Sequence, residues 1–178
     1  IVTLAGGSVT SLILQRFVSH VSETIVLAAF VPIVLAMGGN TGIQSSVLVV
    51  RSLALGTIRG RSVVRMLWRE IATGAIMGVV CGAIIGLWAH VMISRSTSQL
   101  GTDAAPALYL AAVVALALFA AMTFATIFGA LVPIILNKVK IDPAVAAGPF
   151  VTIANDIWAL LIYFSVTAFL LQSYAGPG

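Results

Sequence analysis

Long stretches without a charged residue constrain the fold of this chain more than any other feature. Residues 106–136 contain no Asp, Glu, Lys or Arg. A run of about 20 apolar residues crosses the roughly 30 Å hydrocarbon core of a bilayer as one helix. Such runs lie at about residues 1–18, 24–50, 71–93, 106–136 and 144–172. The sequence therefore predicts an all-α integral membrane protein with five transmembrane helices.

Composition indicates the same environment. The chain is 61% hydrophobic and 8% charged, with a mean hydropathy of +1.16, so polar surface cannot cover it in water. The first residues lack the charged start and cleavage site of a signal peptide. We therefore expect residues 1–178 to be one membrane domain of a longer protein. The single cysteine, Cys81, excludes an intrachain disulfide and is expected to serve packing.

Basic residues predict the orientation. They concentrate in the linkers after the second and the fourth run: Arg51, Arg59, Arg61, Arg65, Arg69, Lys138 and Lys140. Cytoplasmic loops are enriched in Lys and Arg, so the N-terminus is predicted to be cytoplasmic and the C-terminus outside the inner (plasma) membrane. The arginines at 61, 65 and 69 share one helix face, which suits an interfacial segment on anionic lipid headgroups. The alternative is that these arginines serve only to set the orientation of the chain in the membrane.

The third run repeats glycine at every fourth position. Its sequence GAIMGVVCGAIIG contains Gly74, Gly78, Gly82 and Gly86. One face of this helix therefore lacks side chains, which lets another helix backbone approach closely in lipid. We expect the partner helix within the same chain, and a second copy is the alternative.

Two polar residues lie deep in the apolar runs. Counted at about 1.5 Å per residue from Arg51 and Asp142, Asn40 lies about 16 Å and Asp156 about 21 Å from the inner face. Asp156 is the one carboxylate deep inside a run, and a charged Asp there costs roughly 2.5–3.5 kcal/mol. Such a residue usually faces a water-filled path, so Asp156 is the first candidate to contact a metal ion.

Glycines and neutral oxygen donors surround both residues. The stretch GGNTGIQ at 38–44 predicts a broken helix that frees backbone carbonyls, because irregular backbone at this depth lines a cavity or is buried in protein. The pair Gly148 and Pro149 interrupts the fifth run in the same way. The predicted pore-lining residues are Gly38, Gly39, Asn40, Thr41, Gln44, Gly148, Thr152 and Asn155. The alternative is a glycine-rich kink, with Asn40 hydrogen-bonded to a neighbouring helix and Asp156 protonated.

The same two stretches carry a family resemblance. They read PIVLAMGGNTGIQSSVLVVRSLALGTI at 32–58 and IDPAVAAGPFVTIANDIWALLIYF at 141–164. Both closely resemble the signature helices of the MgtE family of magnesium transporters, and the five runs match that family in number and order. The family commonly has Asn at the position of Ile43 and a second Thr at the position of Ile153, whereas Asp156 is retained.

The resemblance implies a homodimeric, channel-like Mg2+ permease. Its pore would lie between the two copies, built mainly from the second and fifth helices, and a cytoplasmic Mg2+-sensing region would lie upstream. Protein sites usually bind Mg2+ through one or two carboxylates and leave it several waters, and one Asp156 per chain supplies two charges across a two-fold axis. Asp142 is a second candidate metal ligand, and equally a helix N-cap. Glu70 is expected to pair locally or to face headgroups, with regulatory Mg2+ binding as the alternative.

Other functional classes compete with a channel. An ion-coupled secondary transporter would use Asp156 as a proton or sodium site, but the sequence shows no inverted repeats. A membrane anchor for soluble domains would not need a midplane carboxylate. No Ser, His and Asp set and no Cys and His cluster converge at one depth. Neither an enzyme nor a nucleic-acid partner is expected.

Overall fold

The structure is a computed structural model that describes residues 2–18, 27–56, 61–100 and 106–175. These residues form helices and turns, without strands: α1 (Val2–Val18), α3 (Val31–Ala54), α4 (Arg61–Leu100), α5 (Ala107–Lys138) and α6 (Pro143–Ala175). The predicted all-α class is confirmed for this part of the chain. Residue 1, residues 24–26 of the second predicted span and Arg59 lie outside the described ranges.

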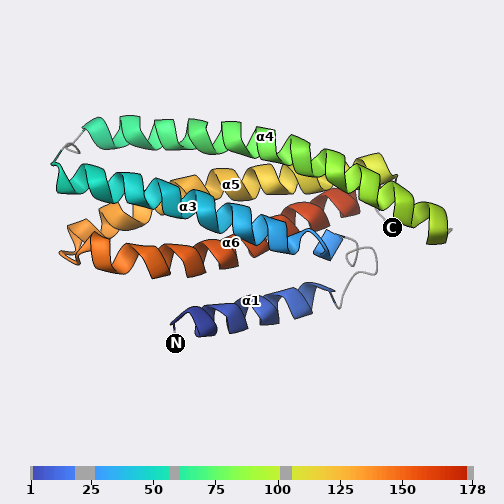
Figure 1. Cartoon of the computed structure of the whole chain (residues 1–178), viewed down its shortest axis with the longest axis horizontal. Helices are drawn as coiled ribbons and strands as arrows, with labels where there is room; N and C mark the ends of the chain where they lie inside the picture. Colours follow the sequence, from blue (N-terminus) through green and yellow to red (C-terminus); the bar gives the residue numbers. More distant parts are fainter. Residues whose placement is uncertain (1, 19–26, 57–60, 101–105, 176–178) are drawn as a thin grey trace.

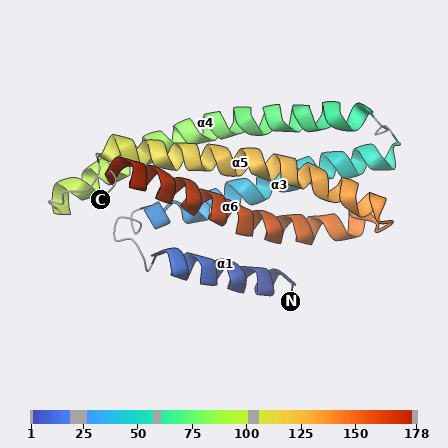
Figure 2. The ribbon, with the colours of Figure 1, turned by 180° about the vertical axis from the view of Figure 1, so that it is seen from behind.

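The helices lie side by side, and successive helices run in opposite directions (Figures 1 and 2). Helix α5 is central, since it packs against α3, α4 and α6. Helices α3 and α6 also contact each other, and α1 packs along α6. The end of α3, the start of α4, the end of α5 and the start of α6 therefore lie at one end of the bundle (Figure 1).

Four helices are long and apolar enough to cross a membrane. The candidate spans are Val31–Ala54, Val63–Arg95, Ala107–Lys138 and Gly148–Tyr174. Helix α1 has 17 residues, fewer than the about 20 that a typical crossing requires. A helix therefore forms at the first predicted span, but its crossing of the membrane stays a prediction.

The arginine-rich linker is mostly helical, which corrects the predicted boundaries. Helix α3 continues to Ala54, and Gly56 follows it at φ +64°, a conformation that commonly ends helices and that glycine adopts without strain. Helix α4 already begins at Arg61 instead of residue 71. Arg65 and Arg69 are exposed on its first turns. The arginine-bearing residues therefore belong to the same continuous helix as the apolar span and do not form a separate segment.

The glycine repeat of α4 faces α5. All four glycines are buried: Gly74, Gly78, Gly82 and Gly86. A Cβ atom added to Gly82 would lie 2.8 Å from the carbonyl oxygen of Ala115, and one added to Gly78 would lie 3.1 Å from Cα of Phe119. The expected packing within one chain is confirmed. Cys81 lies half-buried beside this face and packs against the apolar core, as expected.

Two adjacent aromatic residues attach the C-terminal half of α6 to its neighbours. The rings of Phe17 in α1 and Phe164 stack with their centroids 4.7 Å apart. The Tyr163 hydroxyl donates a 2.9 Å hydrogen bond to the carbonyl oxygen of Leu27, just before α3. These contacts attach α6 to α1 and to the residues before α3 at one level, seven residues after Asp156.

Candidate ion site between α3 and α6

Two adjacent glycines bring α6 close to the backbone of α3. Gly38 and Gly39 are both buried. A Cβ atom added to Gly39 would lie 3.2 Å from Oδ1 of Asp156, and one added to Gly38 would lie 3.2 Å from Cβ of Ala159. The Asp156 carboxylate therefore lies against the α3 backbone at Gly39. Two stretches more than 100 residues apart in sequence meet here.

The predicted helix breaks are wrong. Helix α3 is continuous from Val31 to Ala54, and α6 is continuous through Gly148 and Pro149. The Thr41 hydroxyl donates a 2.5 Å hydrogen bond to the carbonyl oxygen of Met37, and the Thr152 hydroxyl donates a 2.9 Å bond to that of Gly148. Hydrocarbon offers no water to compete for backbone groups, so glycine-rich segments stay helical there. Gly38 and Gly39 provide close packing rather than free carbonyls.

The residues predicted to line a pore separate into several environments. Asn40 and Gln44 are exposed on the surface of the protomer, whereas Thr41 is buried. Asp156 is half-buried and Gly148 is exposed. No hydrogen bond or ion pair joins Asp156 to another residue in the described ranges. Its carboxylate is therefore accessible to a ligand from the protomer surface.

Asn155 lies in the interior rather than beside the Asp156 carboxylate. It is 1% exposed, and a Cβ atom added to Gly42 would overlap its Nδ2. A Cβ atom on Gly129 of α5 would in turn overlap the Gly42 carbonyl oxygen. Within the described residues, neither amide atom of Asn155 has a hydrogen-bond partner. The structure therefore places Asn155 at the junction of α3, α5 and α6.

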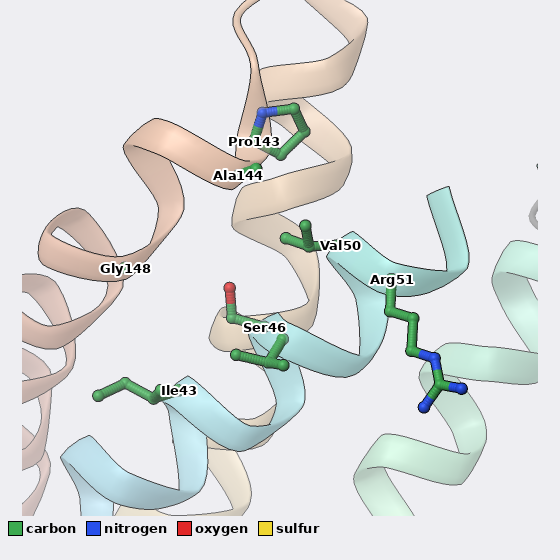
Figure 3. Close-up of a pocket in the computed structure, with 8 residues that line it drawn as sticks. Ile43, Ser46, Val50, Arg51, Pro143, Ala144 and Gly148 are labelled. Carbon is green, nitrogen blue, oxygen red and sulfur yellow. The ribbon is translucent and has the colours of Figure 1, made fainter. Parts of the chain in front are cut away.

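A cavity of about 300 Å³ opens between α3 and the start of α6 (Figure 3). The residues that line it are Ile43, Ser46, Val47, Val50, Arg51, Pro143, Ala144 and Gly148. Residues 43, 46 and 50 follow Gly39 at spacings of three or four, so they share the α3 face that meets Asp156. The Ser46 hydroxyl points toward the start of α6 (Figure 3). We call this space the α3–α6 cavity; its lining runs from Ile43 to Arg51 on α3 and from Pro143 to Gly148 on α6.

The two departures from the family pattern occupy different places. Ile43 lines the α3–α6 cavity. Ile153 instead faces α1, because a Cβ atom added to Gly6 would lie 2.7 Å from its Cγ2. The substitution at position 153 therefore contributes to helix packing, whereas the one at position 43 changes the polarity of the cavity wall.

Asp142 forms the expected N-cap. Its Oδ1 accepts a 2.9 Å hydrogen bond from the backbone amide of Ala144, in the first turn of α6. In the described part of the chain, no group of three or more His, Cys, Asp or Glu side chains could hold a metal ion. A metal role of Asp142 stays a prediction.

The expectation that Glu70 pairs locally or faces the headgroups is wrong. Its Oε2 contacts the hydroxyl of Ser45 on α3, and it forms no ion pair with Arg69 among the described residues. The signal was present in the sequence, because Glu70 precedes Gly74 by four residues. It therefore extends the glycine face that packs inward, and it does not point to the headgroups.

Comparison with known proteins decides the family. A family model described as a divalent cation transporter, MgtE, matches residues 31–166. The chain belongs to the MgtE family. The family description names a transporter and not an enzyme. With four apolar helices, the chain is a multi-pass membrane protein.

Curated relatives agree with this assignment. The chain is 37% identical to the magnesium transporter MgtE of Bacillus subtilis over 165 residues, which are 92% of this chain and 34% of the relative. It is 32% identical to that of Thermus thermophilus over 173 residues, 97% of this chain and 36% of the relative. The Enterococcus faecalis protein is 31% identical over 94% of this chain and 34% of its own length. The chain spans about one third of each relative.

Proposed function

We propose that this chain forms the membrane part of a Mg2+ channel, in which hydrated Mg2+ moves down its electrochemical gradient past Asp156. The observation that carries the proposal is the approach of the Asp156 carboxylate to Gly39 of α3, one turn before Ile43, which lines the α3–α6 cavity. The relatives are named magnesium transporters. The transported ion is inferred from these names together with the carboxylate.

The proposed assembly is a homodimer with five membrane-crossing helices per protomer. One carboxylate suits an ion that keeps several waters, and a two-fold axis would supply the second. Asn40 and Gln44 are exposed polar residues on the same helix as Gly39, and exposure of polar side chains to lipid is costly. A pore between two copies would provide these side chains with water. Thr152 and Gly148 extend the same wall on α6.

The proposed orientation places the N-terminus in the cytoplasm and the C-terminus outside. Five of the seven exposed basic residues in the described ranges lie where α3 and α5 end and α4 begins: Arg51, Arg65, Arg69, Lys138 and Lys140. Cytoplasmic segments carry this excess of positive charge. The relatives extend well beyond the matched region, which leaves length for cytoplasmic domains. Asp142, at this end, is the proposed ligand for a regulatory Mg2+.

Flux measurements in liposomes test the proposal. The purified protein is reconstituted with a Mg2+-sensitive dye inside, and a K+ diffusion potential, negative inside, is imposed. A divalent ion gains roughly 4.6 kcal/mol at 100 mV, so the potential alone should drive uptake. The alternative is a secondary transporter that uses Asp156 as a proton or sodium site. Uptake that requires a proton or sodium gradient, and not the potential, would contradict the channel.

A further inference from the structure

A second carboxylate, Glu70, lies inside the helix bundle. It belongs to the apolar span Val63–Arg95 and is half-buried. Carboxylates within membrane spans are costly and mark functional contacts. Its neighbours on the outer face of α4, Arg65 and Arg69, are exposed, and no ion pair joins either arginine to Glu70 among the described residues. The contact of Glu70 that the structure describes is with Ser45 of α3.

Ser45 connects three helices at this point. It is 2% exposed, and its hydroxyl lies within hydrogen-bonding distance of Glu70 Oε2 and, at 2.9 Å, of the Thr126 carbonyl oxygen on α5. Gly74, one turn after Glu70, packs against Thr126. The polar contact therefore lies at the end of the tight α4–α5 interface and attaches α3 to it.

The contact lies on a different face of α3 from the ion site. Ser45 follows Gly39 by six residues, which is about 9 Å along the helix and about 240° around it. Between them, Gly42 packs against Asn155 and Gly129. Glycine contacts alone constrain rotation of a helix weakly, because they present no side chain to interlock. Buried Val34 and Val49 hold α3 on either side of this stretch. A hydrogen bond at Ser45 adds to these contacts in fixing the rotation of α3, and with it the direction in which Gly39, Asn40 and Ile43 face.

We infer that Glu70 is a positioning residue of the ion path, which it serves by holding Ser45 and thereby the α3 wall opposite Asp156. The inference rests on the proposed function. A rotation of α3 by about 20° would displace its backbone atoms, at a radius of about 2.3 Å, by about 0.8 Å. Displacement of this size at Gly39 changes the space between α3 and the Asp156 carboxylate, and therefore the fit of a hydrated ion.

The test compares Glu70→Ala, Ser45→Ala, the double variant and Glu70→Gln in the same liposomes. Arg69→Gln is the matched control, since Arg69 is adjacent and exposed. The measured quantities are the Mg2+ concentration at half-maximal uptake and the Mg2+/Ca2+ uptake ratio, both independent of the amount of folded protein. Loss of one hydrogen bond changes an equilibrium by about twofold to tenfold. We expect changes of this size for both alanine variants and no further change in the double variant.

Glu70→Gln, which retains a hydrogen-bonding side chain, and Arg69→Gln should match the parent. The inference is overturned if the alanine variants only lower the protein yield and leave both quantities unchanged. It is also overturned if Glu70→Gln behaves like Glu70→Ala, because charge rather than position would then matter. Ser45→Ala removes a single oxygen atom, so it tests the same contact if Glu70→Ala does not fold. Asp156→Asn separates the two proposals: if it conducts like the parent, the proposed path is wrong and the inference falls with it.

Discussion

At the level of single residues, the approach of α3 to α5 depends on Gly42 and Gly129. A Cβ atom on Gly129 would overlap the Gly42 carbonyl oxygen, which is backbone and cannot rotate away. We expect Gly129→Ala to lower the free energy of unfolding by about 1–3 kcal/mol, measured by thermal denaturation in detergent. Gly7→Ala is the control, since no atom lies within 4 Å of the added methyl group. Equal stability of the two variants would contradict the described packing.

The two isoleucines that depart from the family pattern should respond differently to replacement. Ile43 lines the α3–α6 cavity, so Ile43→Asn adds a polar group to the wall of the proposed path. We expect the Mg2+/Ca2+ uptake ratio to rise by about twofold or more, because polar groups that line a pore set its selectivity. Ile153→Thr changes a contact with Gly6 of α1 and should leave the ratio unchanged. If Ile153→Thr raised the ratio and Ile43→Asn did not, position 153 rather than position 43 would lie in the path.

Asn40 provides a direct test of exposure to water. In a Cys81→Ala background, Asn40→Cys should react with a small water-soluble thiol reagent, and Mg2+ should slow the reaction. Ile84→Cys is the control, since Ile84 is exposed on the outer surface of α4, where we expect lipid. Asn40→Leu should lower Mg2+ uptake and leave the fold intact. A cysteine at position 40 that never reacts in a conducting protein would show that Asn40 contacts another helix.

At the level of helices, the glycine face of α4 should determine folding of the protomer. Gly82→Leu would drive a side chain into Ala115 of α5, whereas Ala83→Leu adds the same side chain at an exposed position of the same helix. Overpacking of this kind typically costs about 1–3 kcal/mol. We expect Gly82→Leu to reduce the yield of folded protein and Ala83→Leu to have little effect, by size-exclusion chromatography. A stable Gly82→Leu monomer that only loses dimerisation would contradict packing against α5.

Sequence patterns predicted the positions of the helices better than the contacts between side chains at the candidate site. Apolar runs located α5 and α6 to within a few residues, because lipid requires such lengths. The same patterns wrongly predicted a break of α3 at Gly38 and Gly39. Glycine weakens helices in water, but not where no solvent competes for the backbone hydrogen bonds. Asn155 and Asp156 are adjacent in sequence yet face different surroundings, and the contact between Glu70 and Ser45 joins two helices. Such contacts depend on helix rotation, which local sequence does not specify.

At the level of the whole molecule, charge is distributed along the axis of the bundle. Five of the seven exposed basic residues in the described ranges lie at one end, whereas Asp156 lies in the middle of α6, about 20 Å along the helix from its start. A cation entering from the opposite end would therefore meet Asp156 before it reaches the basic end. In the proposed dimer, the membrane potential would drive entry and two Asp156 carboxylates would recognise Mg2+.

Potential-driven Mg2+ uptake by Asp156→Asn and Asp156→Ala, compared with the parent protein, tests this central claim most directly. Both substitutions remove a charge from an apolar span, so the variants should fold at least as well as the parent, as checked by thermal denaturation. We expect Asp156→Ala to abolish uptake and Asp156→Asn to reduce it nearly as much. Uptake by either folded variant at the rate of the parent would show that Mg2+ does not pass Asp156.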